Sequence, residues 1–206
     1  MRVRFSWLLV GLIAVCAAAA GLWTAQRLDR APQLAGGTWL PQPRSAGSFA
    51  LIDQSGAPFT EARLRGAPSL VFFGFTHCPD VCPTTLYKLA QARRAAAVPH
   101  LRVLFVTLDP ARDTPAMLAR YLHAFDPDFL GLTGSQQTIA ALAAHFGVAF
   151  QRVELPGGDY TMDHSAVVFL LDAGGRIVAV FTAPLDIAAL TQDLRHTSGL
   201  IVHAGS

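Results

Sequence analysis

Length, composition and charge indicate one domain with an apolar appendage. The chain has 206 residues, of which 52% are hydrophobic and 15% are charged, whereas a single core usually takes about 100 to 200 residues. The formal net charge is only +2, and Lys88 is the only lysine. No run of Lys and Arg is available to bind nucleic acid, so no nucleic-acid partner is expected.

The apolar surplus lies at the N-terminus. No charged side chain occurs between Arg4 and Arg27, and as a helix the part from Phe5 to Ala25 would be about 31 Å long, close to the thickness of the hydrocarbon core of a bilayer. Trp7 and Trp23 lie near its two ends, where aromatic rings favour the membrane interface. We therefore predict one N-terminal transmembrane helix, a membrane anchor over residues 1–27.

The charges before the apolar stretch indicate its orientation. Arg2 and Arg4 favour a cytoplasmic N-terminus, and no amphipathic, Ser-rich targeting sequence precedes them. We expect a single-pass protein of the bacterial inner (plasma) membrane, with its domain on the periplasmic, extracytoplasmic side. The same arginines, with the small residues of Ala17–Ala20, also fit a cleaved signal peptide, which stays open as an alternative.

The stretch that follows predicts a flexible linker over residues 28–48. It has no sustained apolar period and carries several residues typical of loops, namely Pro32, Gly36, Gly37, Pro41, Pro43 and Gly47. The folded domain is expected over residues 49–206.

The domain alternates predicted strands and helices. Ser69–Phe75 is a short run of aromatic and β-branched residues, typical of a strand buried on both faces. The other predicted strands cover Phe49–Ile52 with a return toward Phe59, Leu101–Thr107, Val148–Val153, and Ala166–Leu171 with Ile177–Phe181. Helices are predicted from Pro79 toward Ala97, over Pro115–Phe125 capped by Thr114, over Ile139–Phe146 capped by Ser135, and from Ile187 to Arg195. A βαβ half, a hairpin and a closing helix predict an α/β protein with a thioredoxin-like fold, a mixed central sheet flanked by helices.

Two cysteines follow the predicted central strand directly. Ligands and reactive groups gather at the carboxyl ends of parallel strands, which is where Cys78 and Cys82 stand. If both are helical, their Cβ atoms lie about 5 to 6 Å apart on one face, and the helix N-terminus lowers the pKa of Cys78. The pair could bind a metal, form a disulfide or exchange thiols. Two thiolates are soft donors that suit Cu(I) and, less selectively, Zn(II).

A metal bound by this pair needs at least one further donor. His164 directly precedes the predicted strand Ala166–Leu171, so we expect it on a loop at an edge of the sheet, from which its imidazole can reach the cysteines. His77 adjoins Cys78, but neighbouring side chains diverge on such a turn, which makes it the weaker candidate. Cys16 lies within the anchor and is interpreted as an inert apolar cysteine.

Three sequence blocks resemble the SCO/SenC family of copper chaperones, whose members assemble the dinuclear copper centre of cytochrome c oxidase. The blocks are FFGFTHCPDVCPTTL at Phe72–Leu86, VTLDPARDTP at Val106–Pro115 and DYTMDHSAVVFLLD at Asp159–Asp172. The first and third contain the family's CxxxC motif and histidine. The resemblance implies that Cys78, Cys82 and His164 bind copper, as Cu(I) with Cu(II) left open, and that Asp109 and Asp163 are neighbours of the site.

The resemblance also implies a function. We expect a copper metallochaperone, acting as a monomer, that delivers copper to the copper-acceptor subunit of cytochrome c oxidase, which is metal transfer without turnover. The alternative is a thiol-disulfide oxidoreductase that reduces the acceptor's cysteines before metallation, with Cys78 as nucleophile. A disulfide that only staples a helical turn would close a small loop and stabilise little. A peroxidase role rests on the fold alone.

Overall fold

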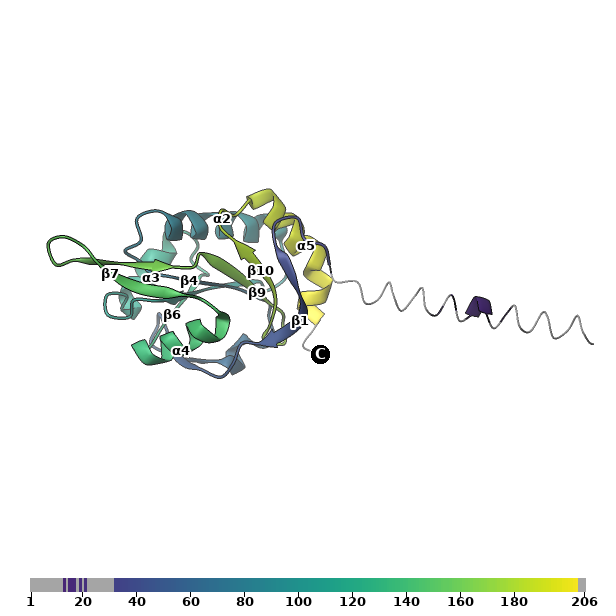
Figure 1. Ribbon diagram of the computed structural model, residues 1–206, viewed down its shortest axis with the longest axis horizontal. Coiled ribbons are helices and arrows are strands. Elements are labelled where there is room, and N and C mark those ends of the chain that lie inside the picture. The colour runs from purple at the N-terminus through teal and green to yellow at the C-terminus, as the bar shows by residue number, and fades with distance from the viewer. Residues whose placement is uncertain (1–12, 14, 18, 20, 22–31, 204–206) are drawn as a thin grey trace, which may run out of the picture. The chain divides into compact units, whose positions relative to one another are not determined.

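A computed structural model describes residues 13, 15–17, 19, 21 and 32–203 of the protein (Figure 1). The chain divides into two compact units, Met1–Pro32 and Gln33–Ser206, and the second contains the folded domain. Most of the anchor predicted over residues 1–27 lies outside the described residues. Within the described part of the chain, no helix combines the length and apolar character needed to cross a membrane.

A mixed eight-stranded sheet forms the centre of the domain, with the strand order β1-β10-β9-β4-β5-β6-β2-β3 (Figure 1). Its strands are β1 (Thr38–Ser45), β2 (Ala50–Asp53), β3 (Pro58–Thr60), β4 (Ser69–Gly74), β5 (Arg102–Thr107), β6 (Leu130–Thr133), β9 (Val167–Leu171) and β10 (Arg176–Thr182). β4, β5 and β6 are parallel, whereas the other pairs are antiparallel. The expected α/β fold with a mixed central sheet is confirmed.

Helices cover both faces of this sheet (Figure 1). They are the 3-10 helix η1 (Glu61–Leu64) and the α-helices α2 (Val81–Ala96), α3 (Pro115–His123), α4 (Gln136–Phe146) and α5 (Ile187–His203). Both predicted caps are present, since Thr114 Oγ1 accepts the N–H of Met117 at 3.3 Å and Ser135 Oγ accepts that of Thr138 at 3.1 Å. α5 continues beyond the predicted end because its apolar face does, and Ile201 is fully buried.

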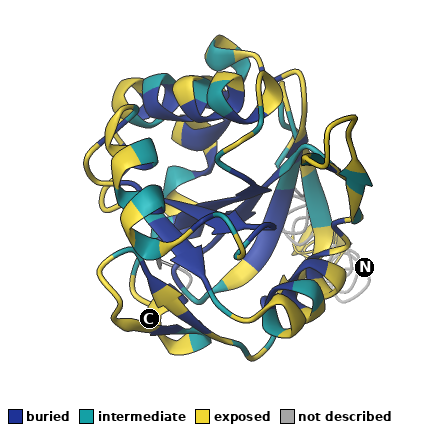
Figure 2. Ribbon diagram, turned by 90° about the vertical axis from the view of Figure 1, so that its left-hand side faces the viewer, coloured by how far each residue is buried: buried dark blue, intermediate teal, exposed yellow. Residues whose placement is uncertain are grey.

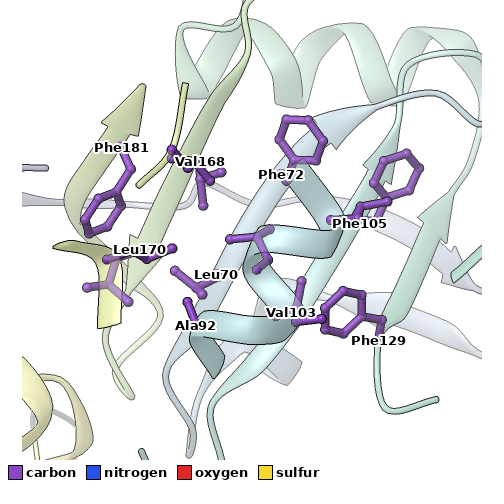
Figure 3. Packing of buried hydrophobic residues seen from close by; sticks show 14 of the residues in the cluster. Leu70, Phe72, Ala92, Val103, Phe105, Phe129, Val168, Leu170 and Phe181 are labelled. Atoms are coloured by element: carbon purple, nitrogen blue, oxygen red, sulfur yellow. The ribbon is translucent and has the colours of Figure 1, made fainter. Parts of the chain in front are cut away.

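The core has two layers that meet at β4, all of whose residues are buried. Successive side chains of a strand point to opposite faces, so Leu70 and Phe72 join α2, α3 and α5, whereas Val71 and Phe73 join α4. Figure 3 shows the first layer, and Figure 2 shows that buried residues concentrate on the strands and on the inward sides of the helices. Each such large apolar side chain contributes about 1.5 to 3 kcal/mol.

Part of the stretch predicted as a linker, residues 28–48, is a strand instead. β1 pairs antiparallel with β10, with Thr38 opposite Val180 and Ser45 opposite Arg176. The prolines that suggested a linker are tolerated because β1 is an edge strand, where a missing N–H donor breaks no ladder. The register shifts between Trp39 and Arg44, the segment that contains Pro41 and Pro43.

Two further strands were not predicted. β6 is short, and a Cβ at its Gly131 would lie 2.8 Å from Leu122 Cδ1, so the glycine permits the close approach of α3. The second is β8 (Tyr160–His164), which pairs with β7 (Phe150–Glu154) in a separate two-stranded sheet. This β7–β8 hairpin projects from the body of the domain on the side away from β1 (Figure 1).

Candidate metal centre

The CxxxC segment connects β4 to α2. After β4 ends at Gly74, a turn forms in which the N–H of Cys78 donates to the carbonyl of Phe75 at 3.3 Å, and α2 begins only at Val81. Cys82 is therefore helical and Cys78 is not, so the case considered above, with both cysteines in one helix, does not hold, and the helix predicted from Pro79 begins two residues later. Pro79 is the physical reason that Cys78 is not helical, because proline disfavours the helical conformation of the residue before it.

The sulfur of Cys78 caps the N-terminal end of α2. Its Sγ accepts the N–H of Cys82 at 3.4 Å, which is one of the donors that the first turn of a helix leaves without a partner. The hydrogen bond from the Cys82 side chain lowers the pKa of Cys78 most; burial opposes it, and hydrogen bonds from His164 and from backbone N–H groups lower the pKa further. The pKa of Cys78 thus lies well below that of an ordinary thiol, and Cys78 is a thiolate at neutral pH.

Cys82 is fully buried in the first turn of α2. Its hydrogen bond to Cys78 raises its pKa, and burial and the negative charges of Cys78 and Asp113 raise it further. A Cβ at Gly74 would lie 2.8 Å from Cys82 Sγ, so this sulfur rests on the end of β4. Both cysteines are free, with Cys78 half-buried and Cys82 buried, and the pair behaves as a thiolate beside a buried thiol.

His164 reaches Cys82 from the end of a strand, not from a loop as expected. It is the last residue of β8, and its Nε2 lies 3.5 Å from Cys82 Sγ. Its Nδ1 lies 3.1 Å from the carbonyl oxygen of Ser165, and because a carbonyl only accepts hydrogen bonds, Nδ1 is the donor of this contact. The ring also contacts Phe72 and Phe75, with centroid distances of 6.2 and 5.9 Å.

The three predicted donor residues therefore gather at one place, but not yet around one point. Cys78 contacts Cys82, and Cys82 contacts His164. Across the described residues, no group of three or more His, Cys, Asp or Glu side chains is close enough to hold a metal ion as it stands. Binding one ion through all three donors requires side-chain movement.

Asp113 directly precedes the helix cap Thr114 and was not among the residues predicted for the site. It is fully buried, and its carboxylate accepts hydrogen bonds from Thr76 N at 3.0 Å, Thr76 Oγ1 at 2.6 Å and Thr107 Oγ1 at 2.6 Å. It thus holds the turn that leads into Cys78 against the end of β5. Its position in the VTLDPARDTP block was the only signal in the sequence that could have indicated this role.

The remaining candidates lie around the site without joining the donors. Asp109 is buried, and its carboxylate binds the side chains of Arg112 and Tyr160. Asp163 is exposed and, as the residue before His164 on β8, points to the opposite face of the strand. His77 is exposed and contacts Thr76, its Nδ1 lying 3.1 Å from Thr76 Oγ1.

Comparisons with known proteins agree with this picture. The model of the SCO1/SenC family matches residues 39–199. An SCO2-like protein of Rickettsia felis is 42% identical over 139 residues, which cover 66% of this chain and 68% of that protein. The structure of Bradyrhizobium japonicum ScoI with copper bound has a TM-score of 0.68 and 40% identity, covering 74% of this chain and 98% of that chain.

A more distant structure shows the same fold. BsSco, described as a member of the Sco family of cytochrome c oxidase assembly proteins with a disulfide switch, has a TM-score of 0.60 at 21% identity and covers 82% of this chain and 98% of that chain. Together, fold and site define a thioredoxin-like domain with a cysteine pair at the carboxyl end of its central strand and a histidine beside it. Because the family model matches most of the domain, the chain belongs to the SCO1/SenC family.

Proposed function

We propose that this protein is a copper metallochaperone, which binds copper through Cys78, Cys82 and His164 and delivers it to the copper centre of cytochrome c oxidase. Copper is then its cargo and not a resident cofactor. The observation that carries the proposal is the distance of 3.5 Å between Cys82 Sγ and His164 Nε2. Two similar proteins support the proposal. Bradyrhizobium japonicum ScoI has been solved with copper bound, and BsSco is described as a member of a family of cytochrome c oxidase assembly proteins.

The donor geometry suits a soft cation. With the bond lengths of zinc sites as a guide, about 2.3 Å to sulfur and about 2.0 Å to nitrogen, two donors on one metal lie about 3.5 to 3.7 Å apart at tetrahedral or trigonal angles. The Cys82 and His164 donor atoms already have this separation. Cys78 is the thiolate that completes the set, and two sulfurs with one imidazole favour Cu(I). Three donors also leave room for a ligand of the acceptor to attack the metal.

We also propose that residues 1–27 anchor the chain in a bacterial inner membrane, with the domain on the periplasmic side. Support comes from the uncharged stretch between Arg4 and Arg27 and from the tryptophans near its ends. Membrane fractionation after a high-salt wash, followed by protease treatment of spheroplasts, tests this. The proposal requires that the chain stay with the membrane and that its domain be digested from outside.

Anaerobic titration of the full chain with Cu(I) against a competing chelator tests the copper proposal. We expect one equivalent for the wild type, loss of tight binding in Cys78→Ala and Cys82→Ala, and weakening by more than tenfold in His164→Ala, since even outer-shell changes cost about 10- to 100-fold. His77→Ala is the matched control, because this exposed histidine is next to Cys78 and should leave binding unchanged. Full stoichiometry and affinity in Cys78→Ala would refute the proposal.

A second candidate function has one observation in its favour. The asymmetry between the low pKa of Cys78 and the raised pKa of Cys82 is typical of a dithiol that attacks a disulfide through one sulfur and resolves through the other. A thiol-disulfide oxidoreductase would oxidise Cys78 and Cys82 to a disulfide while reducing one disulfide of the acceptor. His164→Ala separates the two functions, since copper binding should weaken while dithiol exchange with a disulfide substrate continues.

A further inference from the structure

The position of His164 depends on how the β7–β8 hairpin is held. The hairpin is a separate two-stranded sheet and takes no part in the ladder of the eight-stranded sheet. Side chains two residues apart on a strand share a face, so Tyr160, Met162 and His164 lie on one side of β8. Met162 is buried, Tyr160 contacts Asp109, and His164 contacts Cys82. This face therefore sets where the imidazole meets Cys82.

The contacts of Tyr160 are the most extensive on this face. Its hydroxyl donates to Asp109 Oδ1 at 2.9 Å, and Arg112 Nη1 donates to its carbonyl oxygen at 2.9 Å. Arg112 also forms an ion pair with Asp109. The guanidinium carbons of Arg112 and Arg152 each lie 3.7 Å from the centroid of the Tyr160 ring, so the ring is held between two cations.

This group of contacts is shielded from water. The Asp109 side chain is 4% exposed and that of Arg112 is 19% exposed, so the ion pair and the hydroxyl hydrogen bond are weakened less by solvent than contacts on an open surface. We name Tyr160, Asp109 and Arg112 the hairpin anchor. Within the hairpin anchor, Tyr160 is four residues before His164, which is about 13 Å along a strand. Tyr160 is therefore too far from the copper ligands to contact the metal itself.

The loop that carries the hairpin anchor also holds the cysteine segment. Asp109 and Asp113 both follow β5, and the carbonyl of Asp109 accepts the N–H of Asp113 at 2.9 Å. Asp113 holds Thr76, two residues before Cys78, while Asp109 holds Tyr160, four residues before His164. One short loop thus ties together the two chain segments that supply the donors.

We propose that Tyr160 is a positioning residue for copper binding, acting with Asp109 and Arg112 to keep the β7–β8 hairpin where His164 faces Cys82. The inference deepens the proposed function and rests on it. Without the Tyr160 hydroxyl, Asp109 keeps only its ion pair, the hairpin separates from the loop more often, and the imidazole spends less time beside the thiol. Copper is then held by the two sulfurs alone for a larger share of the time.

A double-mutant cycle in the full chain tests this inference. Tyr160→Phe removes only the hydroxyl, and we expect it to weaken Cu(I) binding about tenfold in the wild-type background and to have no effect in the His164→Ala background. A merely structural role would instead weaken binding equally in both backgrounds, and this result would overturn the inference. Tyr87→Phe, at an exposed tyrosine of α2, is the matched control and should change neither.

A measurement without copper keeps this inference distinguishable from the proposed function. In the metal-free full chain, Tyr160→Phe should speed amide hydrogen exchange in β7 and β8 while that of β4 and β5 stays as in the wild type. Unchanged exchange in the hairpin would overturn the hairpin anchor even if copper binds as proposed. If His164→Ala binds copper like the wild type, the proposed function fails, and the exchange experiment still decides whether the anchor holds the hairpin. Asp109→Asn is the second variant and should show the same pattern.

Discussion

The sulfur of Cys82 and the Nε2 atom of His164 lie 3.5 Å apart, although 82 positions separate the two residues in the chain. The sulfur comes from the first turn of α2 and the nitrogen from the last residue of β8. The imidazole is oriented by the carbonyl of Ser165 and by contacts with Phe72 and Phe75. The donor pair is therefore held in place by the strand on one side and by the aromatic core on the other.

Gly74 offers a direct test of how closely the cysteine is packed. A Cβ there would lie 2.8 Å from Cys82 Sγ and 2.9 Å from Phe105 Cε2. We expect Gly74→Ala to lower the free energy of unfolding by about 1 to 3 kcal/mol, as overpacking usually does, and to displace the sulfur from His164. Urea unfolding of the metal-free protein measures the first effect, and Cu(I) affinity measures the second.

The control for Gly74 is Gly199 of α5, where an added Cβ meets no atom within 4 Å. Gly199→Ala should raise the free energy of unfolding by about 0.5 to 1 kcal/mol, because alanine favours the helix more than glycine does. Copper affinity should stay unchanged. The packing argument fails if both substitutions shift stability in the same direction.

The low pKa of Cys78 predicts a distinctive alkylation profile. A thiol with the ordinary pKa of about 8.5 is almost wholly protonated at pH 6, whereas Cys78, whose pKa is lowered by the Cys82 side chain, is a thiolate there. Its rate of reaction with iodoacetamide should therefore stay nearly constant as the pH falls from 8 to 6. Peptide mass spectrometry of the reduced, metal-free chain measures the rate at each cysteine.

The Cys82→Ala variant, which lacks the side chain that donates to Cys78, is the comparison for this alkylation profile. In Cys82→Ala the pKa of Cys78 should rise, since the hydrogen bond that lowers it most is lost, and alkylation should slow as the pH falls. Cys82 in the wild-type chain should react slowly throughout, because its pKa is raised and its side chain is buried. Equal rates at the two cysteines would contradict the assignment of thiolate and thiol.

Because β1 is part of the sheet, a truncated domain that keeps β1 should be more stable than one that lacks it. A chain that starts at Phe49 lacks β1, leaves the edge of β10 unpaired, and removes the N–H groups of Ala35 and Gly36 that donate to the buried Asp193 carboxylate at 2.6 and 2.8 Å. We expect it to be less stable by at least about 2 to 4 kcal/mol and prone to associate through the free edge. A chain that starts at Gln33 should melt like the full domain.

Thermal unfolding followed by circular dichroism compares the two truncated chains, and light scattering reports association. A melting temperature for the chain from Phe49 equal to that of the chain from Gln33 would show that β1 contributes nothing to stability.

Elements with a strong local sequence pattern were predicted correctly. The buried run of β4, the capping residues Thr114 and Ser135, and the glycine-containing turn between β9 and β10 all predicted what the structure shows. The helix predicted from Pro79 begins at Val81, with Asp80 as its N-cap residue. β1 and β6 were missed because their prolines and glycine are tolerated only through contacts with β10 and α3, which no local pattern reveals.

The sequence by itself determined that two cysteines follow the carboxyl end of a buried strand, since this depends only on hydrophobic pattern and spacing within one short segment. Only the tertiary structure decided that Cys82 meets His164, that Asp113 holds the turn before Cys78, and that Tyr160 rests on Asp109. Each of these contacts joins segments brought together by the packing of the sheet and the β7–β8 hairpin. Such distances are set by the fold as a whole, because a strand or a turn specifies the direction of its own side chains but not the element that it will face.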